Sequence, residues 1–228
     1  MFFDPMYFLF IAPAVLLGMW AQFRIQATYA QAQQLAAPLS GAAAARHILD
    51  SAGLNGVQIE EVPGHLTDHY DPRDKVLRLS QQVYQSRTLA AVGIAAHEAG
   101  HAMQDAHAYA PLLVRNAIVP VAGFGSNAGI LMIIVGAMLH MNPMLIWLGI
   151  GLFSTVVVFQ VINLPVEFNA SAQARAQLVG LGIVNDAELG YVSKVLSAAA
   201  LTYVAATLQA ILTLLYYVMR FTGGNNRE

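Results

Sequence analysis

Four long stretches without a charged side chain constrain this chain more than any other feature. They cover residues 6–23, 117–139, 143–164 and 201–219, and none of them contains Lys, Arg, Asp or Glu. A helix of about 20 apolar residues spans the hydrocarbon core of a bilayer, and each stretch reaches or approaches that length. We therefore predict a mainly α-helical integral membrane protein with about four transmembrane helices.

The composition agrees with a surface that faces lipid. Hydrophobic residues make up 57% of the 228 residues, charged residues make up 11%, and the mean hydropathy is +0.55. A soluble domain carries about 25% charged residues, and a chain of this length cannot bury so much apolar surface in one core. The net charge of −2 and the lack of a basic run argue against nucleic acid as a partner. The predicted partner is the lipid bilayer.

The spans divide the chain into five predicted segments. Residues 1–23 form an N-terminal transmembrane anchor; a signal peptide is the alternative, but Asp4 stands where a signal peptide carries basic residues. Residues 117–164 form a transmembrane hairpin with a very short turn. Two polar regions cover residues 24–116 and 165–200, and the chain closes with a last transmembrane helix and tail over residues 201–228.

The two polar regions lie on the same side of the membrane if all four spans cross it. Basic residues near the span ends are more numerous on that side, with Arg24, Arg115, Arg175 and Lys194 against Arg220 and Arg227. Because cytoplasmic segments carry an excess of Lys and Arg, we predict that both polar regions are cytoplasmic.

The first polar region predicts a small α+β domain. Ser40 is the predicted N-cap of an alanine-rich helix over residues 41–50, which Gly53 ends. Residues 57–62 and 75–79 alternate as strands, and a turn signal over residues 71–74 stands before the second of them. A long helix follows over residues 87–107. The second polar region predicts a helix from Pro165 onward, with a break near Gly180 and Gly182.

The decisive motif is His97-Glu98-Ala99-Gly100-His101, inside that long helix. Two histidines four residues apart lie on one face of a helix, so both imidazoles can bind a single ion. The glutamate between them can take a proton from a water at the open side of the ion. Because the chain has no cysteine, any metal must be held by histidines and carboxylates. The alternative is a pair of histidines that only pack or face water.

A catalytic zinc takes three protein ligands and keeps one position open, so a third ligand must come from elsewhere. Glu167 is the strongest candidate, because a charged carboxylate directly after a span and beside small residues is unfavourable unless it has a role such as binding a metal. The alternative is an interfacial carboxylate that only marks the end of the span. Glu188 and the pair Glu60 and Glu61 are weaker candidates, since their surroundings are polar.

Residues 68–73 (Asp-His-Tyr-Asp-Pro-Arg), 76–80 and 95–102 carry a family resemblance. They are similar to the bacterial membrane peptidases of the neutral zinc metallopeptidase (YugP-like) family, and the resemblance covers nearly the whole chain. More distantly, the layout resembles gluzincin membrane proteases of the HtpX heat-shock and CAAX-processing types, in which a second glutamate after a span completes the zinc site. The resemblance implies one Zn²⁺ per chain, with Glu167 as third ligand, a zincin-like minidomain on the membrane face, and a bacterial plasma membrane.

The resemblance also implies how a substrate binds and how the histidines are oriented. In such folds an edge strand pairs with the substrate backbone, which would be residues 75–80 or a neighbouring strand. The family tends to have an aspartate at the position of Asn169, and the distant relatives have one at the position of Ser171. A carboxylate that orients a zinc histidine is therefore missing there, and Asp105, on the same helix face as both histidines, is a candidate to replace it.

We therefore predict a zinc metalloendopeptidase that hydrolyses peptide bonds of membrane proteins or peptides near the bilayer surface. Glu98 is its predicted general base. Arg175 and Tyr70 are candidates to stabilise the oxyanion, although a surface ion pair and half-buried packing are the better explanations for them.

Two other classes of protein compete with this hypothesis. A non-catalytic zinc-binding membrane adaptor or scaffold is the first, but such a site needs no base beside its ligand. A channel or transporter is the second, and the lack of ionisable residues in the spans argues against it. A membrane regulatory partner and a homo-oligomer both stay open as further associations.

Overall fold

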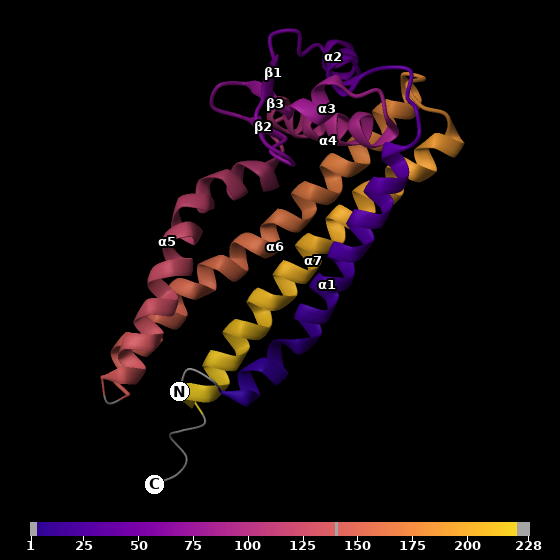
Figure 1. The fold of residues 1–228 in the computed structure, drawn as a ribbon. Helices are drawn as coiled ribbons and strands as arrows, with labels where there is room; N and C mark the ends of the chain where they lie inside the picture. Colours follow the sequence, from indigo (N-terminus) through magenta and orange to yellow (C-terminus); the bar gives the residue numbers. More distant parts are fainter. Residues whose placement is uncertain (1–3, 140, 223–228) are drawn as a thin grey trace. The chain divides into compact units, whose positions relative to one another are not determined.

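The computed structural model describes residues 4–139 and 141–222; residues 1–3 and the predicted tail with Arg227 lie outside the described residues. Within the described residues the chain forms seven helices and three strands (Figure 1). They are α1 (Pro5–Gln33), α2 (Gly41–Ser51), β1 (Gln58–Val62), β2 (His69–Asp71), β3 (Val76–Ser80), α3 (Gln81–Gln85), α4 (Leu89–Ala106), α5 (Ala110–Met138), α6 (Pro143–Gly180) and α7 (Asp186–Thr222).

Four of the described helices, α1, α5, α6 and α7, are long and apolar enough to cross a membrane. Together with the small sheet they confirm the predicted fold class. The chain divides into two compact units. The helical unit comprises Met1–Trp20, Leu113–Leu164 and Thr202–Glu228, and the sheet unit comprises Ala21–Leu112 and Pro165–Leu201.

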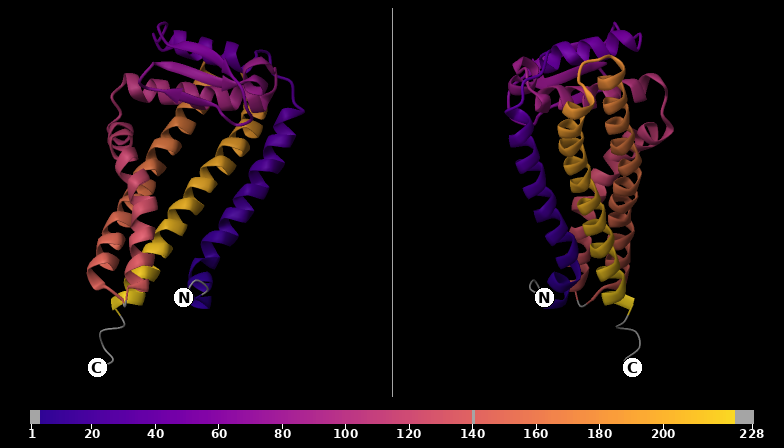
Figure 2. Two further views of the ribbon diagram at one scale, coloured as in Figure 1. Left: turned by 60° about the vertical axis from the view of Figure 1, so that its left-hand side comes forward. Right: turned by 90° about the vertical axis from the view of Figure 1, so that its right-hand side faces the viewer.

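In the helical unit, α5 and the first part of α6 form the predicted hairpin (Figure 2). Asn142 builds its turn: the backbone N–H donates to the Gly136 carbonyl at 2.8 Å, and the side-chain oxygen accepts from the Leu145 N–H at 3.2 Å. This second bond caps the first turn of α6. The helices then meet backbone to backbone, since a Cβ on Gly149 would lie 2.6 Å from the Gly129 carbonyl oxygen.

The sheet of the sheet unit has the strand order β1-β3-β2. Strand β3 pairs in parallel with β1, from Gln58 opposite Val76 onward, and antiparallel with β2, from His69 opposite Arg78 onward. The structure corrects one inference from the family resemblance. Residues 75–80 cannot be the edge strand that pairs with a substrate, because both sides of β3 are already occupied. The edges of this sheet are β1 and β2.

The core of the sheet unit forms around α4. The Thr88 hydroxyl accepts from the Ala91 N–H and caps the start of α4. The Ser40 hydroxyl does the same for α2 by accepting from the Ala43 N–H, as the sequence predicted. Small and apolar side chains of α4, β3 and α2 are buried together, among them Val92, Ala95, Leu77, Leu79, Ile48 and Leu49.

Helices α6 and α7 are longer than the predicted spans. Pro165 lies inside the continuous 38-residue helix α6 instead of starting a new helix. A proline in a helix removes one backbone hydrogen bond, and the neighbouring turns of α6 tolerate that loss. The predicted break is present, because α6 ends at Gly180 and Gly182 has a φ of 64°. The following helix α7 begins at Asp186, well before the predicted span at residue 201.

Candidate metal centre

Helix α4 carries the two histidines of the motif on one face. The ring centroids of His97 and His101 are 4.8 Å apart, and the ring planes are nearly perpendicular at 84°. Gly100, between them in the sequence, lies against α6: a Cβ at this position would be 2.7 Å from the Ala170 carbonyl oxygen. The glycine therefore allows the α6 backbone to approach the helix that carries the histidines.

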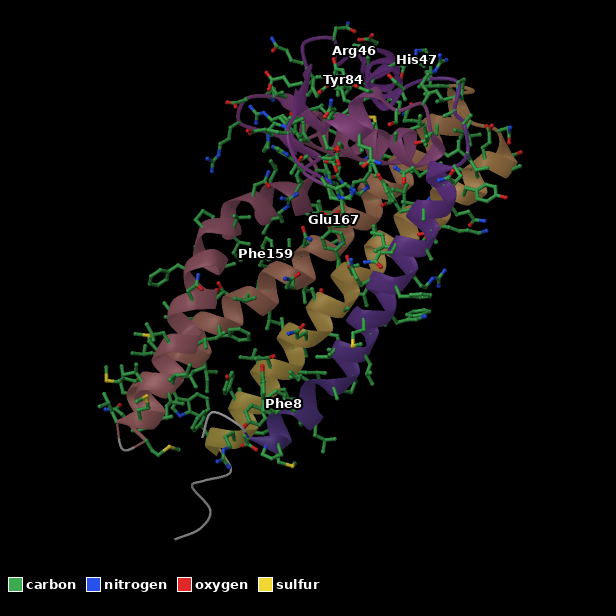
Figure 3. All side chains as sticks on the ribbon, viewed as in Figure 1. Phe8, Arg46, His47, Tyr84, Phe159 and Glu167 are labelled. Carbon is green, nitrogen blue, oxygen red and sulfur yellow. The ribbon has the colours of Figure 1, made fainter. Side chains whose placement is uncertain are left out.

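Glu167 on α6 faces both histidines and is labelled in Figure 3. Its Oε2 atom lies 3.2 Å from Nε2 of His97 and 3.8 Å from Nε2 of His101. The residue is 5% exposed, so its carboxylate is largely removed from water. One ligand atom from each of the three residues lies within 4.8 Å of the other two, so this group can bind a metal ion.

The donor set suits zinc. Zinc in proteins binds two imidazole nitrogens and a carboxylate oxygen at bond lengths of about 2.0–2.2 Å in a tetrahedral arrangement, which puts neighbouring ligand atoms about 3.4 Å apart. The distances of 3.2 and 3.8 Å from Glu167 to the two imidazoles are close to that spacing. The residues present therefore fit a zinc site with one position left open.

The second nitrogen of each imidazole contacts a neutral side chain. Nδ1 of His97 is 3.1 Å from the Ser171 hydroxyl, and Nδ1 of His101 is 3.0 Å from the side-chain oxygen of Gln104. The Nε2 atoms of both histidines therefore face Glu167. Neither Ser171 nor Gln104 was predicted as a partner of an imidazole, although helical spacing carried a signal: Ser171 is four residues after Glu167, and Gln104 is three residues after His101.

Asp105, predicted to orient a zinc histidine, has other contacts. Its carboxylate accepts a hydrogen bond from the Tyr70 hydroxyl at 2.8 Å and contacts Nζ of Lys75 at 3.3 Å. Burial, together with the hydrogen bond to Asp105, raises the pKa of Tyr70, so this hydroxyl stays protonated. The structure thus joins two of the predicted site residues, Tyr70 and Asp105, to each other.

Opposing influences act on His97. Burial lowers the pKa of its imidazole, but the hydrogen bond with Glu167 and the charges of Glu98 and Glu167 outweigh burial and raise the pKa overall. The positive charge of Arg175 lowers the pKa of His97. Arg175, one of the predicted oxyanion candidates, is therefore close enough to interact electrostatically with the centre.

The carboxyl group of Glu98 has a raised pKa. Burial raises the pKa of its carboxyl to about 7; the charge of His97 opposes the rise, and the charges of Glu167 and Asp68 add to it. A carboxyl group with a pKa near neutrality can both accept and donate a proton. The residue next to the first histidine is therefore suited to proton transfer.

Comparisons with known proteins agree with this geometry. The family model described as "Putative neutral zinc metallopeptidase" matches residues 7–222. The chain is 46% identical over 226 residues to the "Putative membrane protease YugP" of Bacillus subtilis (strain 168), an alignment that covers 98% of this chain and 100% of that protein. No solved structure matches the chain.

Proposed function

Because this chain belongs to the neutral zinc metallopeptidase family, we propose that it is a membrane zinc endopeptidase that cleaves membrane proteins or peptides near the bilayer surface. One observation carries the proposal: ligand atoms of His97, His101 and Glu167 converge within 4.8 Å of one another. We propose that these residues hold one zinc ion per chain and leave the fourth position for the reaction.

The reaction is peptide-bond hydrolysis. Bound zinc polarises the scissile carbonyl and makes the attacking water more acidic. Glu98 accepts a proton from that water and delivers it to the leaving nitrogen as the C–N bond breaks. The burial of Glu98, which raises the pKa of its carboxyl, supports a role in proton transfer. Of the two predicted oxyanion candidates, Arg175 is the better supported, because the Tyr70 hydroxyl already donates to Asp105.

The test uses the full chain, purified in detergent, and measures zinc content together with cleavage of fluorescently labelled unfolded casein. We expect about one zinc per chain in the wild type and a clear loss in Glu167→Ala. Glu98→Gln should keep its zinc and lose cleavage. Glu61→Gln, at an exposed carboxylate that contacts Gln85, is the matched control and should keep both.

Two outcomes would contradict these assignments. Full zinc content in Glu167→Ala would mean that another carboxylate is the third ligand. Wild-type zinc binding without any cleavage that depends on Glu98 would favour the adaptor or scaffold alternative, because a structural site needs no adjacent base.

We further propose that the centre faces the cytoplasm of a bacterial cell, since basic residues near the span ends are more numerous on that side. The chain has no cysteine, so Asp74→Cys and Met141→Cys each introduce a single thiol. In intact cells, a membrane-impermeant maleimide should label the thiol at position 141, in the hairpin turn, and leave the one at position 74 unlabelled until the membrane is opened. The reverse labelling pattern would mean that the centre faces the outside of the cell.

A further inference from the structure

Gln104 is fully buried on α4 and contacts three polar groups at once. Its side-chain oxygen lies 3.0 Å from Nδ1 of His101. Its side-chain nitrogen donates to the Val166 carbonyl at 2.8 Å and to the side-chain oxygen of Asn169 at 2.9 Å. A buried amide with every one of these contacts satisfied has little freedom to rotate.

The Val166 carbonyl determines which way the Gln104 amide points. A backbone carbonyl can only accept, so the NH₂ group must face Val166 and the amide oxygen must face His101. The opposite orientation would set the amide oxygen against the carbonyl oxygen of Val166. Asn169 reinforces this direction, because its side-chain oxygen also accepts from the Gln173 amide at 2.6 Å.

The orientation of the Gln104 amide determines which ring nitrogen of His101 carries the hydrogen. An amide oxygen can only accept, so Nδ1 of His101 must carry the hydrogen. A neutral imidazole has one N–H, and the lone pair is therefore on Nε2, the atom that lies 3.8 Å from Glu167. His97 differs, because the Ser171 hydroxyl at its Nδ1 can either donate or accept.

We propose that Gln104 is a positioning residue for the zinc centre: it holds His101 in the tautomer with Nδ1 protonated and Nε2 unprotonated, so that Nε2 can bind the ion. The inference rests on the proposed zinc site. Gln104 also contacts the turn of α6 that carries Glu167, since Val166 and Asn169 flank this ligand in the sequence. One neutral side chain thus orients a ligand on α4 and ties it to the third ligand on α6.

The first experiment reads the tautomer directly in the full chain without metal. Histidine labelled with ¹⁵N in the ring is observed by NMR in detergent micelles, at an alkaline pH at which the imidazoles are neutral. The His101 signals are assigned from their loss in His101→Gln. We expect the wild type to carry the hydrogen on Nδ1, and Gln104→Met to shift the population toward Nε2–H. A wild-type His101 protonated on Nε2 would overturn the inference, whether or not any variant folds.

The second experiment measures zinc affinity by competition with a chelator. Loss of a group that orients a metal ligand typically weakens binding by about 10–100-fold, and we expect a loss in this range for Gln104→Met. Gln85→Met is the matched control: Gln85 is exposed and its amide contacts Glu61 outside the centre, so the zinc affinity should stay within about threefold of the wild type. Wild-type affinity in a folded Gln104→Met would overturn the inference.

The two experiments separate this inference from the proposed function. A wild type that binds no zinc under metal-replete conditions would overturn the proposed zinc site. A wild type that binds zinc but has His101 protonated on Nε2 would overturn only the role of Gln104.

Discussion

Gly100 lies where the helix of the histidines approaches the helix of Glu167 closely. A methyl group at this position would lie 2.7 Å from the Ala170 carbonyl oxygen and 3.2 Å from two further backbone atoms of Ala170. Backbone cannot rotate away as a side chain can, so Gly100→Ala must push α6 outward and carry Glu167 with it. We predict a loss of zinc affinity of at least about tenfold in this variant, measured by chelator competition.

Gly190→Ala is the matched control for this variant. Gly190 lies in α7, also in the sheet unit, and a Cβ there would meet no atom within 4 Å. Alanine is the better helix former by about 1 kcal/mol, so Gly190→Ala should keep its zinc affinity and unfold at an equal or higher temperature. Equal zinc affinity in the wild type and Gly100→Ala would show that the centre does not depend on this close approach.

Single residues of the centre were predictable to different degrees. The spacing of His97 and His101 could be read from the sequence, because two ligands on one helix must satisfy a simple geometric rule. Glu167 was only a candidate from its place after a span, and the family resemblance favoured it over the alternatives. The partners of the ring nitrogens could not be read in this way. Helical spacing alone favours Asp105 as much as Gln104, and only the position of α6 brings the Val166 carbonyl to the Gln104 amide.

At the scale of elements, Arg78 on β3 connects the sheet to the turn before it. Its guanidinium contacts the carboxylates of Asp71 at 2.6 Å and Asp74 at 2.8 Å. The hydrogen bond from Arg78 and then the Arg73 backbone N–H lower the pKa of Asp71, although burial opposes them. A carboxyl whose pKa is lowered on folding stabilises the folded state above its unfolded pKa of about 3.9, and this contribution disappears as the pH falls through the folded value.

We therefore predict that Asp71→Asn lowers the thermal unfolding temperature at neutral pH, and that the difference from the wild type shrinks as the pH falls below about 4. Thermal unfolding of both proteins across this range of pH is the measurement. Asp74→Asn removes the more exposed contact, whose carboxylate side chain is 61% exposed, and should have a smaller effect. A difference for Asp71→Asn that stays constant with pH would exclude the ionised pair as its cause.

The hairpin of α5 and α6 depends on glycines at defined places. A Cβ on Gly129 would lie 2.9 Å from the Gly149 carbonyl oxygen and 2.9 Å from the Phe153 nitrogen, whereas a Cβ on Gly123 would meet nothing within 4 Å. We predict that Gly129→Ala lowers the thermal unfolding temperature in detergent, because it separates two backbones in contact. Gly123→Ala, on the same helix, should leave it unchanged or raise it. Equal effects of the two would exclude close packing as the explanation.

The positions of the elements were predicted better than their lengths. Caps, turn glycines and apolar runs mark α2, α4 and the hairpin in the sequence, and these elements are present. Helices α6 and α7 extend beyond the apolar spans because alanine-rich sequence such as residues 170–178 favours helix without being apolar enough to mark a span. Strand β2 has only three residues, and its conformation depends on pairing with β3, which no local pattern reveals.

At the scale of the whole molecule, the candidate metal centre brings together parts of the chain that are far apart in sequence. His97 and Glu167 are 70 residues apart, and the whole of α5 lies between them in the chain. A ligand that binds only the folded state stabilises it by about 4 kcal/mol when present at a thousand times its dissociation constant. Zinc bound at this centre should therefore stabilise the sheet unit, which contains all three ligands.

We predict that removal of zinc by a chelator lowers the thermal unfolding temperature of the wild type by on the order of 10 °C. In Glu167→Ala the same chelator should have little effect, because the ion is already lost. Thermal unfolding of both proteins with and without chelator checks this expectation. Equal shifts in the two proteins would mean that the chelator acts at a site other than the proposed one.

The neutral contacts of the two imidazoles determine the electric charge at the centre. Ser171 and Gln104 bring no charge to His97 and His101, and Glu167 supplies a single negative charge. A divalent ion held by these three ligands would therefore keep one formal positive charge, which an ionised Glu98 beside His97 would balance and a protonated Glu98 would leave in place. Compounds that coordinate zinc through an anionic group, such as hydroxamates, thiolates and phosphinates, are then attracted by charge as well as by coordination. They are the class of inhibitor that such a centre should bind most tightly.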